Sequence, residues 1–189
     1  SLGSNKAIVI DGNVPTVASV TSTKTNGGYT VGDTIPITIT FTQTVTVTGA
    51  PYLTLALDNI NAAGAFFAGS GSSILTFNYI VASGHTSGDL DYGSTNALEL
   101  GSGTIKDASG NDATLTLPTP GATNSLGANK ALIIDTTGPT VSSVSSTKAN
   151  AAYKVGESIP INVLFDDKVY VTGTPQLTLE TGTTDAVVD

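Results

Sequence analysis

The sequence predicts an all-β chain made of β-sandwich repeats in tandem, and three observations support this. Short apolar runs with a period of two recur along the chain, no segment longer than ten residues has the apolar spacing of a helix, and one stretch occurs twice. Residues 1–57 align without a gap on residues 125–181, and 32 of the 57 pairs are identical. The offset of 124 residues suits one sandwich domain per repeat.

The alignment divides the chain into three parts. Residues 1–11 are expected to be the last strand of a preceding repeat, residues 12–135 a complete repeat, and residues 136–189 an incomplete following repeat. A partial copy of about 50 residues buries little surface and exposes strand edges. We therefore expect either that the chain is an excised piece of a longer protein, or that strands of a neighbouring molecule complete the partial copy.

Within the complete repeat the clearest strand is 35–41. There Ile35, Ile37, Ile39 and Phe41 share one face while threonines occupy the other. Pro36 indicates an edge strand or the entry of a strand. Other strands are expected at 16–23, 45–49, 51–57, 65–69 and 73–81, and loops at 26–33, 58–64 and 82–89.

The second half of the repeat is less regular. Residues 90–100 could form a strand, a short helical turn or both. Residues 103–118 are expected to form a hairpin whose turn is acidic and contains Gly and Asn. The second copy then begins at Ser125 with the motif SLGxNKA.

The amino-acid composition excludes several classes of binding partner and of chemical reaction. The net charge is −8 with only 7 Lys and Arg, which argues against nucleic acid as a partner but permits divalent cations. The absence of Cys and the presence of a single His exclude a disulfide framework, a Cys–His pair and zinc catalysis. No apolar run reaches the length of a membrane span, so we expect no direct membrane insertion.

Several phrases of the sequence carry a family resemblance. They are VIDGNVPTV and IIDTTGPTV around Asp11 and Asp135, YxVGDxIPI from Tyr29, FTQTVTVTGAPYLTL from Phe41, and IKDASGNDATL from Ile105. The chain resembles the immunoglobulin-like, cadherin-like tandem repeats of giant bacterial surface proteins, including adhesin extender regions and relatives of the cyanobacterial swimming-motility surface protein. The resemblance implies an antiparallel Greek-key sandwich in a stalk on the cell surface, often with Ca²⁺ at the junctions between repeats.

Acidic residues near the repeat boundary are the first candidates for metal binding. If the sandwich has seven strands, Asp135, Asp166 and Asp167 are expected to converge at the junction of the two copies. Asp89 and Asp91 could add oxygens from the far end of the first copy. Ca²⁺ takes six to eight oxygen ligands and removes the repulsion between crowded carboxylates. The alternative is that these residues are solvated loop acids.

A second group of candidates surrounds Asp11, which is equivalent to Asp135. The first copy has Thr42 and Gln43 where the second has its two acids, so a site at Asp11 would need other ligands. The DASGND turn could supply them through Asp107, Asn111 and Asp112. The alternative is a tight hairpin turn, because Asp, Gly and Asn all favour turn geometry.

The main functional hypothesis is a structural one: a stalk or extender segment of a secreted or surface-anchored bacterial protein, with calcium-stiffened junctions and neighbouring repeats as partners. The alternative is a self-assembling fibre or surface-layer subunit, in which copies join by β-strand complementation. A third hypothesis is glycan binding by exposed aromatics such as Tyr52. We expect no enzymatic activity and interpret His85 as a surface loop residue.

Overall fold

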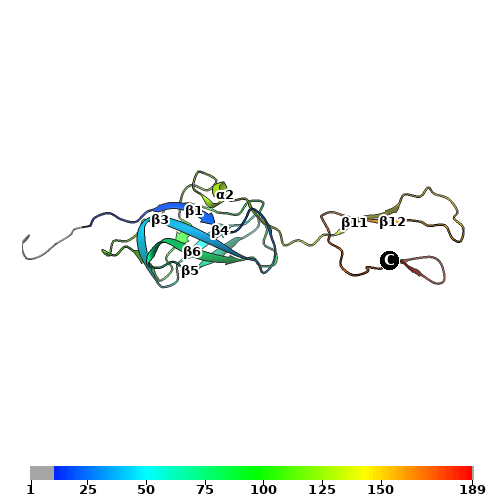
Figure 1. Ribbon diagram of the computed structural model, residues 1–189, viewed down its shortest axis with the longest axis horizontal. Helices are drawn as coiled ribbons and strands as arrows, with labels where there is room; N and C mark the ends of the chain where they lie inside the picture. The colour runs from blue at the N-terminus through cyan, green and yellow to red at the C-terminus, as the bar shows by residue number, and fades with distance from the viewer. Residues whose placement is uncertain (1–10, 189) are drawn as a thin grey trace, which may run out of the picture. The chain divides into compact units, whose positions relative to one another are not determined.

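The computed structural model describes residues 11–188, and the chain divides into two compact units. Unit 1 comprises residues 1–136 and unit 2 comprises residues 137–189 (Figure 1). The described residues are mostly β, and their only helix is α2 (Leu126–Asn129). The strand expected over residues 1–11 lies outside the described residues, apart from Asp11.

Unit 1 is built on one antiparallel sheet whose main path runs β1-β3-β6-β5-β4-β7 and curls around the core (Figure 1). Two further strands join this sheet off the main path, β8 beside β4 and β9 beside β3. The strands are β1 (Val17–Ser22), β3 (Thr34–Thr48), β4 (Tyr52–Ala56), β5 (Asn61–Ala68), β6 (Ser72–Ile80), β7 (Asp91–Tyr92), β8 (Leu98–Glu99) and β9 (Thr104–Lys106). The all-β prediction is confirmed.

The strand β3 is longer than predicted and changes partner along its length. Its first half pairs with β6 and its last residues, 46–48, pair with β9. The register shifts between Thr40 and Val45, as at a β-bulge, and such an irregularity lets a strand bend without ending. The prediction of two strands at 35–41 and 45–49 is therefore wrong, and Thr42 and Gln43 lie within a strand rather than in a loop.

Three smaller predictions also need correction. The expected loop 26–33 contains β2 (Gly27–Tyr29), which pairs in parallel with β10 (Leu132–Ile134). The expected loop 58–64 already contains the start of β5. The expected hairpin 103–118 has a single strand, β9, joined to its return by an isolated bridge between Lys106 and Asp112. Strand β2 has a partner more than one hundred positions away, whereas β5 and the Lys106–Asp112 bridge pair with segments close in sequence.

The core of unit 1 lies against the concave face of the sheet. The predicted face of β3 is confirmed, because Ile35, Ile37 and Ile39 are fully buried and Phe41 is 2% exposed. Strand β6 contributes alternate residues, and the core is completed by loops and by α2. The largest fully buried side chains outside β3 are Leu53, Leu55, Leu75, Phe77, Tyr79, Leu90, Tyr92, Ile105 and Leu126.

Unit 2 repeats part of the strand pairing of unit 1. Its strands are β11 (Val141–Ser146), β12 (Ile161–Phe165), β13 (Leu177–Leu179) and β14 (Ala186–Val188). The pairing Val141↔Phe165 is equivalent to Val17↔Phe41, and the irregularity one residue later occurs at the same place in both pairs of strands. The sequence repeat is thus also a repeat of register.

Local interactions of side chains repeat as well. The Tyr29 hydroxyl donates to the carbonyl of Thr25 at 2.6 Å, and the Tyr153 hydroxyl donates to the carbonyl of Ala149 at 2.5 Å. A lysine lies 5.1 Å from the ring centroid of each of these tyrosines. The tyrosine and the lysine that recur at an offset of 124 therefore make the same local contacts in both units, although this segment contains a strand only in unit 1.

Candidate cation-binding residues and an open strand edge

The acidic turn after β9 is held by its own hydrogen bonds. Asp107 Oδ1 accepts from the amides of Ser109 and Asn111 at 2.9 and 2.8 Å, and Oδ2 accepts from Asn111 Nδ2 at 2.9 Å. The same Asn111 amide group donates to the carbonyl of Asp11 at 3.2 Å, and Ser109 Oγ donates to Asp11 Oδ2 at 3.3 Å. The structure therefore brings Asp11, Asp107 and Asn111 together.

Protein hydrogen-bond donors already occupy the Asp107 carboxylate, as in an ordinary tight turn. Asp112 points to a different partner, since its Oδ1 lies 2.6 Å from Lys106 Nζ in an exposed ion pair. Hydrogen bonds from donors already balance the Asp107 carboxylate. The turn thus has the geometry it needs without an ion.

Hydrogen bonds from the Asn111 side chain, and from the backbone of Asn111, Ser109 and Gly110, hold the pKa of Asp107 below its usual range. Its stabilising effect is therefore present above the unfolded pKa of about 3.9 and is lost as the pH falls through the lower folded pKa. We expect Asp107→Asn to lower the melting temperature at neutral pH and to reduce its fall on acidification below about pH 4. Melting curves from pH 2 to 7 test this, with the exposed Asp58→Asn as control. An unchanged acid limb in Asp107→Asn would contradict it.

Two other predicted residues, Asp89 and Asp91, point toward α2. A Cβ added to Gly127 would lie 2.9 Å from Asp91 Oδ2 and 3.4 Å from Asp89 Oδ2, so both carboxylates converge on the space above this glycine. Asp91 Oδ2 also accepts from the amide of Gly121 at 3.0 Å. The two carboxylates carry like charges and face the same point. Their oxygen atoms are ligands that suit a hard divalent cation. The sequence could not reveal the role of Gly127, which lies 36 positions from Asp91.

The remaining predicted ligands belong to different units. The backbone amide of Asp135, in unit 1, donates to the carbonyl of Tyr29 at 3.0 Å. In unit 2, Asp166 Oδ1 accepts from the amide of Thr140 at 2.7 Å and its Oδ2 bonds the Thr140 hydroxyl. Asp167 Oδ1 accepts from the next backbone amide at 2.6 Å. The convergence of these acids stays a prediction.

Comparison of the two units gives Asp166 a structural role that the sequence pattern did not suggest. In unit 1 the amide of Thr16 donates to Thr42 Oγ1 at 3.0 Å, and Thr42 is equivalent to Asp166. The side chain at this position therefore anchors the entering strand in both units. The hydrogen bonds from the Thr140 hydroxyl and amide hold the pKa of Asp166 below its usual range.

Among residues 11–188 there is no cluster of three or more His, Cys, Asp or Glu side chains placed to hold a metal ion. Any cation held by the pairs described above must therefore take further oxygens from the backbone, from water or from a partner.

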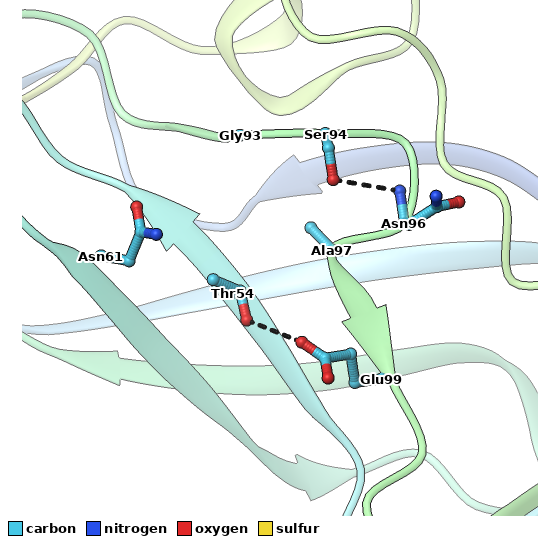
Figure 2. Close-up of a pocket in the computed structure, with 7 residues that line it drawn as sticks. All are labelled: Thr54, Asn61, Gly93, Ser94, Asn96, Ala97 and Glu99. Atoms are coloured by element: carbon cyan, nitrogen blue, oxygen red, sulfur yellow. Dashed lines mark hydrogen bonds between the residues drawn. The ribbon is translucent and has the colours of Figure 1, made fainter.

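A polar hollow of about 390 Å³ lies beside β4 and β8 (Figure 2). Glu99 Oε1 accepts from the Thr54 hydroxyl at 3.2 Å, and its Oε2 accepts from the Tyr52 hydroxyl at 2.7 Å. Tyr52 is half-buried and bound in this way, whereas Tyr170 is 81% exposed. The remaining lining residues are Asn61, Gly93, Ser94, Asn96 and Ala97. Glycan binding at Tyr52 stays a prediction.

His85 lies in the loop between β6 and β7, as predicted, but it packs against the core. Its Nδ1 lies 2.8 Å from the Tyr79 hydroxyl, and the two rings stack with centroids 5.8 Å apart. Burial raises the pKa of Tyr79. The histidine thus serves to satisfy a buried tyrosine hydroxyl and to close this end of the core.

Several apolar side chains are exposed in unit 2, whereas the equivalent side chains of unit 1 are buried. Val144, Ile159 and Val163 are 54%, 44% and 39% exposed, whereas Val20, Ile35 and Ile39 at the equivalent positions are 0% exposed. Strand β12 pairs with β11 only, within the described residues. Ile159 and Val163 line a groove of about 1040 Å³, together with residues of the segment that leads to β13.

No protein-family model matches the chain, and neither a search of curated proteins nor a search of solved structures finds a match. No helix in the described part of the chain is both long and apolar enough to cross a membrane.

Proposed function

We propose that this chain is a stalk or extender segment of a secreted or cell-surface bacterial protein, built from tandem β-repeats. The observation that supports the proposal is the equal strand register of β1/β3 and β11/β12, including the irregularity. Stacked copies of one β unit act as spacers, because each copy adds a fixed length and needs contacts only with its neighbours. Neighbouring repeats are then the principal partners.

The finer fold of each repeat is, in this proposal, an antiparallel Greek-key sandwich of the immunoglobulin-like class. Two features support it. The first is β3, which passes from β6 to β9 and so links two groups of strands. The second is the parallel pairing of β2 with β10, which joins the beginning of the repeat to its end. The return of a late strand by a long connection to lie beside an early one is a Greek-key feature, although the β2–β10 pair itself is parallel.

Calcium is the cation we propose for the stalk, with Asp89 and Asp91 as its candidate ligands in unit 1 and with Asp135, Asp166 and Asp167 as the predicted junction set. The converging carboxylates above Gly127 support the first of these. When bound, Ca²⁺ would offset the repulsion between the carboxylates, while Gly127 leaves space for it because it has no side chain.

Calorimetric titration of the chelator-treated chain with Ca²⁺ tests this proposal. We expect saturable binding and a stabilisation of about 2.7 kcal/mol at a hundredfold excess over the dissociation constant, seen as a rise in melting temperature. The rise should be lost in the double variant Asp89→Asn/Asp91→Asn and kept in the control Asp58→Asn. Loss in Asp135→Asn or Asp166→Asn instead would place the ion at the predicted junction. Solution scattering should show a longer particle with Ca²⁺. The absence of heat would contradict the calcium proposal but not the repeat stalk.

The second candidate function is a self-assembling fibre or surface-layer subunit joined by β-strand complementation. The exposed apolar side chains of unit 2 favour it, since exposed hydrophobic patches mark interaction surfaces. Sedimentation velocity at several concentrations separates the two functions. A stalk segment remains monomeric, whereas an assembling subunit forms larger species as its concentration rises.

A further inference from the structure

We infer that Asn26 is a site of covalent self-modification, at which the side-chain amide is lost and isoaspartate forms, and that hydrogen bonds to Ala131 control the rate. The site lies in unit 1, directly before the pairing of β2 with β10. It depends only on contacts within unit 1, so it is independent of the stalk, the calcium site and the assembly surface.

The reactivity comes from the pair Asn26–Gly27, which is the only Asn-Gly step in the sequence. The backbone nitrogen of Gly27 can attack Cγ of Asn26, because glycine has no side chain to hinder the approach. A bond forms between these two atoms, the side-chain nitrogen leaves as ammonia with the proton that Gly27 gives up, and a succinimide ring remains. Water then opens the ring at either carbonyl and yields aspartate or isoaspartate. Asn26 is exposed, so water reaches the ring.

In the folded chain the backbone of Ala131 holds both reacting groups. Its carbonyl accepts from the amide of Gly27 at 3.0 Å, and its amide donates to Asn26 Oδ1 at 3.2 Å. The proton that Gly27 must lose and the carbonyl that must be attacked are therefore both engaged with β10. Attack requires these hydrogen bonds to break, so the rate of the reaction follows the local opening of the β2–β10 pair.

The conformation of Gly27 explains why a reactive pair stands at this position. Its φ is +148°, a value that residues with a side chain rarely adopt. The glycine that lets β2 begin here is thus the same residue that makes Asn26 reactive. The equivalent pair in unit 2 is Asn150–Ala151, whose alanine hinders the attack.

The two products differ in their effect on the fold. Aspartate leaves the main chain unchanged, and its Oδ1 can still accept from the amide of Ala131. In isoaspartate the main chain runs through the side chain and gains one carbon atom. The register from Leu132↔Gly27 to Ile134↔Tyr29 then no longer fits. The isoaspartate form is therefore expected to lose the pairing of β2 with β10, which joins the beginning of the repeat to its end.

The test incubates the full chain at mildly alkaline pH, folded and in denaturant, and follows Asn26 by peptide mapping with mass spectrometry. We expect isoaspartate at Asn26 in both samples, at a rate at least about tenfold lower in the folded chain. In denaturant, Gly27→Ala should slow the reaction to the rate of Asn150–Ala151 in the same sample. Absence of isoaspartate at Asn26 in denaturant would overturn the site, and equal rates in the two samples would overturn the control by Ala131.

Two further measurements need no variant that disturbs the fold. Hydrogen exchange of the Gly27 amide reports how often the pair opens, and low denaturant concentrations raise this frequency. The rate of isoaspartate formation should rise in proportion to the exchange rate, and a rate that stays constant would contradict the role of opening.

The melting temperature of the isoaspartate form, separated by chromatography, tests the effect on the fold. We expect it to melt below the parent chain, whereas Asn26→Asp, which has the aspartate product at this position, should melt with the parent. Equal melting of the isoaspartate form and the parent would contradict the loss of the β2–β10 pairing.

Discussion

Replacing Gly69 by alanine is expected to lower the free energy of unfolding of unit 1 by about 3 kcal/mol or more. Gly69 has a φ of +107°, and a Cβ added to it would lie 2.0 Å from the carbonyl oxygen of Ile74. That oxygen belongs to β6 backbone and cannot move away without disturbing the pairing of β6 with β3. Denaturant unfolding monitored by circular dichroism measures the loss.

The matched control for Gly69 is in the same turn. Gly71 also has a positive φ, +86°, but a Cβ added to it would meet nothing within 4 Å. Gly71→Ala is therefore expected to cost only the strain of the left-handed conformation, about 1–2 kcal/mol. Equal losses in the two variants would show that backbone conformation, and not the contact with Ile74, sets the cost.

The substitution Ile35→Ala is expected to destabilise unit 1 by about 2–5 kcal/mol, because it leaves a cavity in a close-packed core. Ile35 is 0% exposed and lies opposite Tyr79, itself 1% exposed. The equivalent substitution in unit 2, Ile159→Ala, is expected to cost less than about 1 kcal/mol, because Ile159 is 44% exposed. Denaturant unfolding of both variants measures the difference at one repeat position.

This pair of variants also reports on the surroundings of unit 2 in solution. If Ile159→Ala cost as much as Ile35→Ala, the groove of unit 2 would be filled in solution by another chain. A loss that grows with protein concentration would point to the same conclusion, since association stabilises by mass action.

The fold class was predictable because it depends on local periodicity. The alternation of Ile35, Ile37 and Ile39 with threonines places one face of β3 in the core whichever strands pair with it. The repeat was predictable because identical residues at a constant offset make the same local contacts, as the hydroxyl groups of Tyr29 and Tyr153 show.

The ends and partners of strands were less predictable. Residues 42–44 have no turn-forming Gly or Pro, yet the apolar pattern predicts separate strands at 35–41 and 45–49 on either side of them. Strand β2 was missed because Gly27 and Gly28 are typical of loops, and only β10, more than one hundred positions later, makes them a strand. Pairing energy comes from a partner that local sequence does not contain.

For the candidate sites, the amino-acid types alone located the acidic residues and showed that the chemistry open to them is that of oxygen ligands. Only the tertiary structure decided which of these acids meet. It placed Asp89 and Asp91 together above Gly127, whereas Asp107 and Asp166 became acceptors for nearby donors. The reason is physical: a carboxylate's role depends on what lies within a few ångströms of it, and those neighbours come from segments that folding, rather than sequence proximity, brings together.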